Sequence, residues 1–157
     1  MTGNLVPHRG RHEGDLVPEG GPTARAASET GEFTNVGVEE EFQVVDLETR
    51  SLVAKGPELL DQLPAATFTA ELHRSVVESQ TMVCQELSAL RGELVRSRHA
   101  LASVASQQGL GVVASGTVPL VDPLRVAITE TSRYRQMLED YQLLVREQLI
   151  CGAQVHV

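Results

Sequence analysis

Alternating apolar and polar residues mark the stretch 36–45, which reads VGVEEEFQVV. Side chains of a strand alternate between two faces with a period of two. One face therefore carries four apolar residues and one acid, namely Val36, Val38, Glu40, Phe42 and Val44. The other face carries Glu39, Glu41 and Gln43. The pattern predicts a strand over about 34–46 with an apolar face and an acidic back.

Further patterns predict an α+β fold, an antiparallel sheet backed by two long helices. Short strands are expected at 52–54, 75–80, 110–115 and 153–157, the first of them closing a hairpin with the strand at 36–45. Prolines at 57 and 64 bound a short helix at 56–63. The long helices are expected at 85–108 and 132–150, where apolar residues recur at helical intervals; the second has the stripe Tyr134, Met137, Tyr141, Leu144 and Gln148.

The chain divides into two parts by composition. Residues 1–33 contain six glycines and three prolines without periodic pattern, so we predict a disordered leader before an ordered domain at 34–157. The alternating pattern of the last strand is still in progress at Val157. We therefore expect the sequence to be a fragment of a longer protein, truncated at its C-terminus.

Charge and composition exclude several classes of function. A net charge of -8 argues against nucleic acid as the main partner, because phosphate-binding surfaces need clustered Lys and Arg. No apolar run approaches the ~20 residues that span a bilayer, and the N-terminus lacks the apolar core of a signal peptide. No membrane association and a cytoplasmic location are expected.

The two cysteines, Cys84 and Cys151, show neither a disulfide framework nor metal-finger spacing, so free thiols are expected. Their presence leaves open a Cys/His nucleophile pair with one of the histidines at 73, 99 and 156. Phosphate-loop, GxGxxG, HExxH and GxSxG motifs are absent from the sequence.

The acidic back of the first strand is the main candidate for chemistry. Glu39 and Glu41 repel each other on one face, and a divalent ion such as Mg²⁺ would neutralise them. Glu78, in the strand at 75–80, and His156, on the polar side of the last strand, can reach the same face of an antiparallel sheet. The residues alone also allow a blander interpretation, a solvated strand face with Glu78 as an ordinary surface residue and His156 in a structural role.

The order of these segments resembles the N-terminal part of the carboxylate-amine ligase family related to glutamate-cysteine ligase type 2. The matching segments, from about residue 34 to the end, are VGVEEEFQVVD at 36–46, VES at 77–79 with VC at 83–84, the helix at 87–94, ASGT at 114–117 with Pro119, RYR at 133–135 and CGAQVHV at 151–157. Departures from the family pattern are Arg74, where many relatives have glutamate, and Val118, Leu120 and Gln154, in the segments that often read GTHPF and HVH.

The resemblance implies an incomplete catalytic domain similar to that of glutamine synthetase. It implies ATP-dependent ligation, in which ATP activates glutamate as an acyl phosphate and an amine such as cysteine displaces phosphate to give γ-glutamylcysteine. It also implies Mg²⁺ bound by Glu39, Glu41, Glu78 and His156. The amine acceptor is not fixed by the sequence, and a homo-oligomer is compatible with it.

Two functions follow for the chain as given. The first is the N-terminal part of such a ligase, inactive alone because half a cleft cannot position both ATP and glutamate. The alternative is a non-catalytic truncated module that acts in protein–protein interaction through the open sheet edge at its last strand.

Overall fold

A computed structural model describes residues 35–118 and 121–157, so the predicted leader at 1–33 lies outside the described residues. Its sheet has five strands, and every strand pair is antiparallel. In chain order the elements are β1 (Gly37–Asp46), α1 (Gly56–Leu60), β2 (Phe68–Ala70), β3 (Val76–Gln80), α2 (Leu87–Gln107), β4 (Leu110–Val113), a 3₁₀ turn η1 (Pro123–Arg125), α3 (Ser132–Tyr141), α4 (Leu143–Glu147) and β5 (Ala153–His156). The predicted α+β class with an antiparallel sheet is confirmed.

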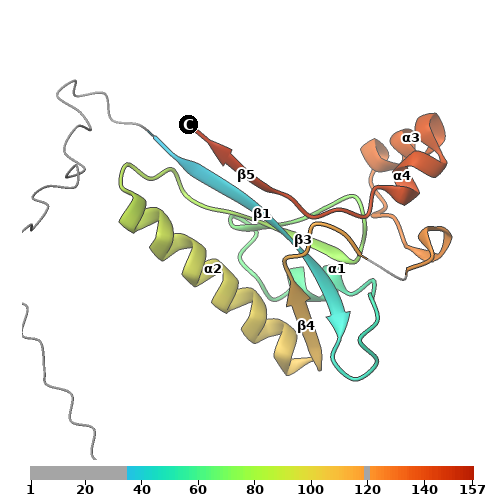
Figure 1. The fold of residues 1–157 in the computed structure, drawn as a ribbon, viewed down its shortest axis with the longest axis horizontal. Coiled ribbons are helices and arrows are strands. Elements are labelled where there is room, and N and C mark those ends of the chain that lie inside the picture. The colour runs from blue at the N-terminus through green and yellow to red at the C-terminus, as the bar shows by residue number, and fades with distance from the viewer. Residues whose placement is uncertain (1–34, 119–120) are drawn as a thin grey trace, which may run out of the picture. The chain divides into compact units, whose positions relative to one another are not determined.

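Strand β1 is the centre of the sheet (Figure 1). Along one side it pairs with β3, which in turn pairs with β2. Two strands share its other side, because β5 pairs with residues 37–40 and β4 with residues 43–46. The sequence pattern of β1 thus places its polar residues in the middle of the sheet.

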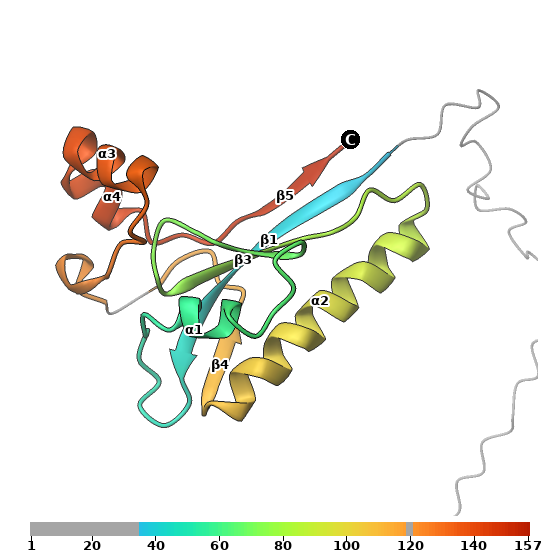
Figure 2. The ribbon, with the colours of Figure 1, turned by 180° about the vertical axis from the view of Figure 1, so that it is seen from behind.

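Helices α1 and α2 cover the apolar face of the sheet. Phe42, Val44 and Val77 are buried on this face, together with Leu101 of α2 and Leu59 of α1. Glu40 shares the face, as its alternation predicts, and is 7% exposed. Figure 2 shows α2 running alongside the sheet, and both views place α3 and α4 on the other side of β1 from α2.

The end of α2 is set by Gly109. This residue has φ of +71°, a left-handed conformation that glycine adopts at little cost at a helix C-terminus. The chain reverses there, and β4 starts at the next residue and pairs with β1. The helix predicted at 85–108 and the strand predicted at 110–115 are both present, with slightly shorter bounds.

The second long helix of the sequence analysis is divided in the structure. Gln142, with φ of 44°, separates α3 from α4, so a single helix over 132–150 is wrong. The stripe assigned to it divides as well, since Tyr134 is buried whereas Tyr141 and Leu144 are exposed. Val145 packs instead with Tyr134 in a small cluster of its own.

Other differences are local. The return strand expected at 52–54 is reduced to a bridge between Leu52 and Val45, and β2 is a strand that the pattern did not predict. Cys84 and Cys151 are free, as expected. In the described part of the chain, none of the helices combines the length and the apolar character that a bilayer crossing requires.

Candidate metal centre

The face of the sheet opposite α2 is polar. Residues paired across antiparallel strands project to the same face, and Glu41 of β1 lies opposite Glu78 of β3. Thr69 of β2 lies opposite Glu78 in turn, which extends the polar face toward the end of β2. On the other side of β1, His156 of β5 lies opposite Gly37. The four residues predicted from the sequence, Glu39, Glu41, Glu78 and His156, therefore share one face.

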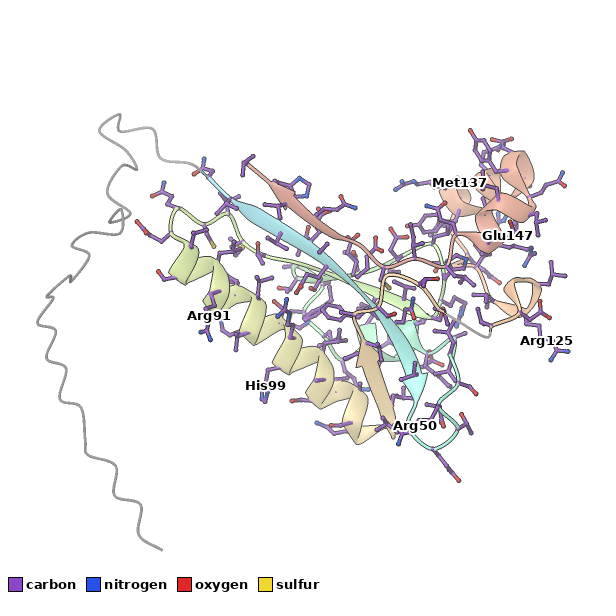
Figure 3. The ribbon with its side chains drawn as sticks, viewed as in Figure 1. Arg50, Arg91, His99, Arg125, Met137 and Glu147 are labelled. Atoms are coloured by element: carbon purple, nitrogen blue, oxygen red, sulfur yellow. The ribbon has the colours of Figure 1, made fainter. Side chains whose placement is uncertain are left out.

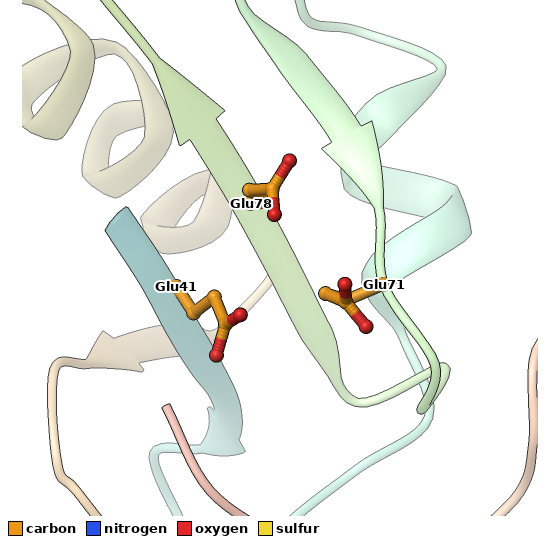
Figure 4. Close-up of side chains that lie close together, drawn as sticks. All are labelled: Glu41, Glu71 and Glu78. Atoms are coloured by element: carbon orange, nitrogen blue, oxygen red, sulfur yellow. The ribbon is translucent and has the colours of Figure 1, made fainter. Parts of the chain in front are cut away.

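Three carboxylates converge on this face (Figure 4). One oxygen from each of Glu41, Glu71 and Glu78 lies within 4.8 Å of the other two. They come from β1, from the residue that follows β2, and from β3. This spacing suits a hard cation such as Mg²⁺, which binds carboxylate oxygens directly and completes its shell with water.

Hydrogen bonds hold each of the three carboxylates in place. The Gly152 amide donates to Glu41 Oε2 at 2.8 Å, and the Thr69 hydroxyl donates to Glu78 Oε1 at 3.0 Å. The Leu72 amide donates to Glu71 Oε2. Within residues 35–118 and 121–157, the second oxygen of each carboxylate accepts no hydrogen bond, so each keeps one oxygen that could bind an ion.

Burial and like charge both act on Glu78 in this cluster. Burial raises the pKa of Glu78, the hydrogen bond from Thr69 opposes that rise, and the charges of Glu39, Glu71 and Glu41 raise the pKa further. The pKa of Tyr134 in α3 is raised by burial and then by the negative charge of Glu71. A bound cation would offset the repulsion that these shifts record.

Glu39 and His156 form a separate pair beside the three carboxylates. His156 Nε2 lies 3.4 Å from Glu39 Oε2, and both residues are partly exposed. The group of three carboxylates includes neither of them. Of the four predicted ligands, the structure therefore brings Glu41 and Glu78 together directly and places Glu39 and His156 next to them on the same face.

Glu71 was missed in the sequence analysis. A short alternation was available, because Phe68 and Leu72 are buried while Thr69 and Glu71 lie on the polar side. The signal is weak because β2 has three residues and Ala70, in phase with the buried pair, is exposed. Its contribution depends on pairing with β3, which no local pattern reveals.

The thiol of Cys151 also lies at this face. Burial raises its pKa to about 11, with a further increase from Glu41, while a hydrogen bond with Gln43 acts in the opposite direction. The thiol stays protonated at neutral pH, which argues against Cys151 as a nucleophile. Cys84 is buried under α2 in the apolar cluster with Val36.

A cleft of about 880 Å³ adjoins the polar face at Gln43. Its walls include the hairpin residue Arg50, the β4 residue Val113 and Arg125 of η1. The Gln43 side chain donates to the Ser115 carbonyl at 3.4 Å and so links the sheet to the loop that lines the cleft. Cavities of this size are typical of small-molecule sites.

Comparison with known proteins gives a consistent result. The family model described as glutamate-cysteine ligase family 2 matches residues 35–157. A relative from Mycolicibacterium smegmatis with the provisional name glutamate–cysteine ligase 2-2 is 54% identical over 122 residues, which are 78% of this chain and 31% of the relative. A relative from Rhodococcus jostii, provisionally named glutamate–cysteine ligase 2-3, is 51% identical over 122 residues, 78% of this chain and 15% of its own length.

A more distant relative from Sorangium cellulosum, provisionally named glutamate–cysteine ligase 2, is 43% identical over 132 residues, 81% of this chain and 35% of its own length. The chain thus spans about a third or less of the relatives that it matches. Because the family model covers all of the described residues, the chain belongs to glutamate–cysteine ligase family 2.

Proposed function

We propose that residues 35–157 form part of the catalytic domain of an ATP-dependent carboxylate-amine ligase. The observation that carries the proposal is the convergence of Glu41, Glu71 and Glu78 within 4.8 Å in a chain of this family. A ligase that handles ATP needs a cation to neutralise its phosphates, and an oxygen-only set of ligands suits that cation.

The proposed reaction has two steps. An oxygen of the glutamate side-chain carboxylate attacks the γ-phosphorus of ATP, and ADP leaves. The nitrogen of the amine then attacks the carbonyl carbon of the acyl phosphate, the bond to the phosphate oxygen breaks, and the nitrogen loses a proton. The names of the relatives favour cysteine as the amine.

Each part of the polar face has a proposed role. The free oxygens of Glu41, Glu71 and Glu78 would hold Mg²⁺, which supplies positive charge where phosphoryl transfer concentrates negative charge. Glu39 and His156, next to this group, would provide a second binding point for Mg²⁺ on the same face. The cleft beside Gln43 would receive one of the substrates, since Gln43 lies on the same face of β1 as Glu41, two residues further along the strand.

We further infer that the 157-residue chain does not complete the reaction alone, because it spans 31% of the Mycolicibacterium smegmatis relative. A chimera solves this difficulty for the test. The matching 122 residues of that relative are replaced by those of this chain, and ADP release is measured with ATP, Mg²⁺, glutamate and cysteine.

In the chimera, Glu41→Gln, Glu71→Gln and Glu78→Gln are each expected to lower kcat about 100-fold or more, because each removes charge that positions the phosphates. Glu147→Gln, an exposed residue of α4, serves as the control and should leave kcat unchanged. If the Glu41→Gln and Glu147→Gln variants had equal kcat values, the group of three carboxylates would not belong to the active site. Turnover that does not require glutamate would contradict the proposed substrate.

A further inference from the structure

A second cavity, of about 640 Å³, is lined by three arginines from separate segments of the chain. Arg74 precedes β3, Arg135 belongs to α3 and Arg146 belongs to α4. Figure 3 labels Met137 and Glu147, which mark the two helices that carry Arg135 and Arg146. This group, the arginine cavity, is distinct from the polar face that carries the carboxylates.

The wall of the arginine cavity is held by backbone hydrogen bonds. The Arg74 amide donates to the Ala127 carbonyl at 2.9 Å, and the Thr129 amide donates to the Leu72 carbonyl at 2.9 Å. The segment 126–130 is therefore fixed against the chain that precedes β3. The opposite wall comes from α3 and α4, whose Tyr134 and Val145 pack against Leu72.

Among the residues that line this cavity, arginines outnumber acids, although the charge of Arg74 also lowers the pKa of Glu58 in α1, which lies outside the lining. None of Arg74, Arg135 and Arg146 forms an ion pair with any residue in the described ranges. Glu130 is the one acid among the lining residues, so three arginines and one glutamate give a formal charge of 3 − 1 = +2. The whole chain carries -8, so the cavity runs against the overall charge.

Partial burial makes these charges suitable for a ligand. Arg74 and Arg146 are half-buried, and Arg135 is exposed at the opening. Guanidinium groups that are partly removed from water and face a shared cavity repel one another, and an anion between them would reverse the sign of that interaction. The planar guanidinium group binds two oxygens of a carboxylate or a phosphate at once.

We propose that the arginine cavity binds a small oxyanion, a phosphate or a carboxylate group, through Arg74, Arg135 and Arg146. The proposal does not depend on the proposed reaction, because none of the carboxylates Glu41, Glu71 and Glu78 lines the arginine cavity.

The test uses the 157-residue chain and two probes, inorganic phosphate and succinate. Each is titrated by isothermal calorimetry at constant ionic strength, which removes general screening as a cause of any change. Binding of phosphate alone, of succinate alone, or of both supports the site and identifies which oxyanion it takes. Failure of both probes to bind at millimolar concentrations overturns the proposal.

Variants locate any binding that is found. Arg135→Gln combined with Arg146→Gln is expected to raise Kd about ten-fold or more, since each removes a charge-assisted hydrogen bond. The single variant Arg135→Gln, at an exposed position, should raise Kd in the same direction even if the double variant folds poorly. Arg91→Gln, on the exposed side of α2 (Figure 3), is the control and should leave Kd unchanged. Equal Kd values for wild type and the Arg135 and Arg146 variants would overturn the proposal.

Discussion

At the scale of single residues, Glu40 stands out because it lies on the face of β1 that packs against α2. Its Oε2 accepts a hydrogen bond from Arg98 Nε at 2.9 Å, and a second contact joins Oε1 to Arg98 Nη2. The side chain of Glu40 is 9% exposed and that of Arg98 is 54% exposed. Arg98 thus compensates a nearly buried carboxylate from the solvent side, which allows an acid to sit within an apolar face.

Removal of Arg98 should therefore destabilise the fold more than removal of its neighbour on the same helix. Arg98→Ala leaves the Glu40 carboxylate unpaired, and we expect a cost of about 1–3 kcal/mol in the free energy of unfolding. Arg96→Ala breaks an exposed i,i+3 pair with Glu93 and should cost about 0.5 kcal/mol or less. Urea unfolding of both variants measures the difference, and the helix propensity of alanine cancels between them.

A second variant separates the charge from the packing of the Arg98 side chain. Adding Glu40→Gln to Arg98→Ala removes the unpaired charge and should recover part of the lost stability. If the Arg98 and Arg96 variants unfold at the same urea concentration, the ion pair to Glu40 contributes nothing measurable.

At the scale of elements, the break between α3 and α4 lies at one of the two non-glycine residues with positive φ among the described residues. Gln142 has φ of 44° and ψ of −107°, a region that residues with a side chain rarely occupy. Its amide still donates to the Leu138 carbonyl, which closes α3. The break turns Val145 into the small cluster with Leu72 and Tyr134, so packing offsets the backbone strain.

Glycine at this position should stabilise the protein. We expect Gln142→Gly to raise the free energy of unfolding by about 1 kcal/mol, because relief of a strained φ exceeds the entropy that glycine gains in the unfolded chain. Gln136→Gly, within α3, has the opposite expectation and should cost about 1 kcal/mol. Thermal unfolding of the two variants gives the signs, and destabilisation by both would show that Gln142 is not strained.

The same elements show how far sequence patterns reach. The strand β1 and the helix α2 were predictable, because both are long and their apolar periods of two and of 3.6 are nearly complete. The split at Gln142 was not, since apolar residues continue through it and the break depends on where Val145 packs. Strand β2 was missed because three residues are too few to show a period.

The candidate site divides in the same way. Glu39 and Glu41 were found from the alternation of β1, Glu78 and His156 were candidates from two further predicted strands, and the resemblance to a known family implied that all four bind a metal ion. Neither the alternation nor the resemblance predicted Glu71, because its approach to Glu41 depends on a register that spans three strands. Local alternation predicts which face a residue occupies, whereas pairing between distant strands decides which of those residues meet.

At the scale of the whole molecule, repulsion among carboxylates on the polar face of the sheet destabilises the fold, and a bound cation would neutralise it. Three carboxylates within 4.8 Å add to the repulsion in a chain of net charge -8. At such distances each pair of charges costs on the order of 1 kcal/mol in a well-solvated setting and more where solvent is excluded. The unbound fold therefore bears a cost that binding of a divalent ion would convert into stabilisation.

This coupling predicts that one variant is more stable than the wild type without Mg²⁺ but gains less stability when Mg²⁺ is added. With EDTA present, Glu41→Gln combined with Glu78→Gln should raise Tm, because repulsion falls while the amide oxygens still accept from Gly152 and Thr69. Mg²⁺ at ten times its Kd should stabilise the wild type by about 1.4 kcal/mol and the variant far less. Differential scanning calorimetry across a Mg²⁺ series measures both effects.

The matched control removes two charges elsewhere. Glu48→Gln combined with Glu147→Gln changes two exposed residues, one in the hairpin turn and one on α4, and lowers the net negative charge by the same amount. It should keep the full response to Mg²⁺, since a general reduction of negative charge does not create or remove a site. If the control loses that response as fully as the Glu41 and Glu78 variant does, then Mg²⁺ acts on overall charge and the polar face is not a metal centre. A lower Tm for the Glu41 and Glu78 variant in EDTA would show instead that the carboxylates hold the strands together without any ion.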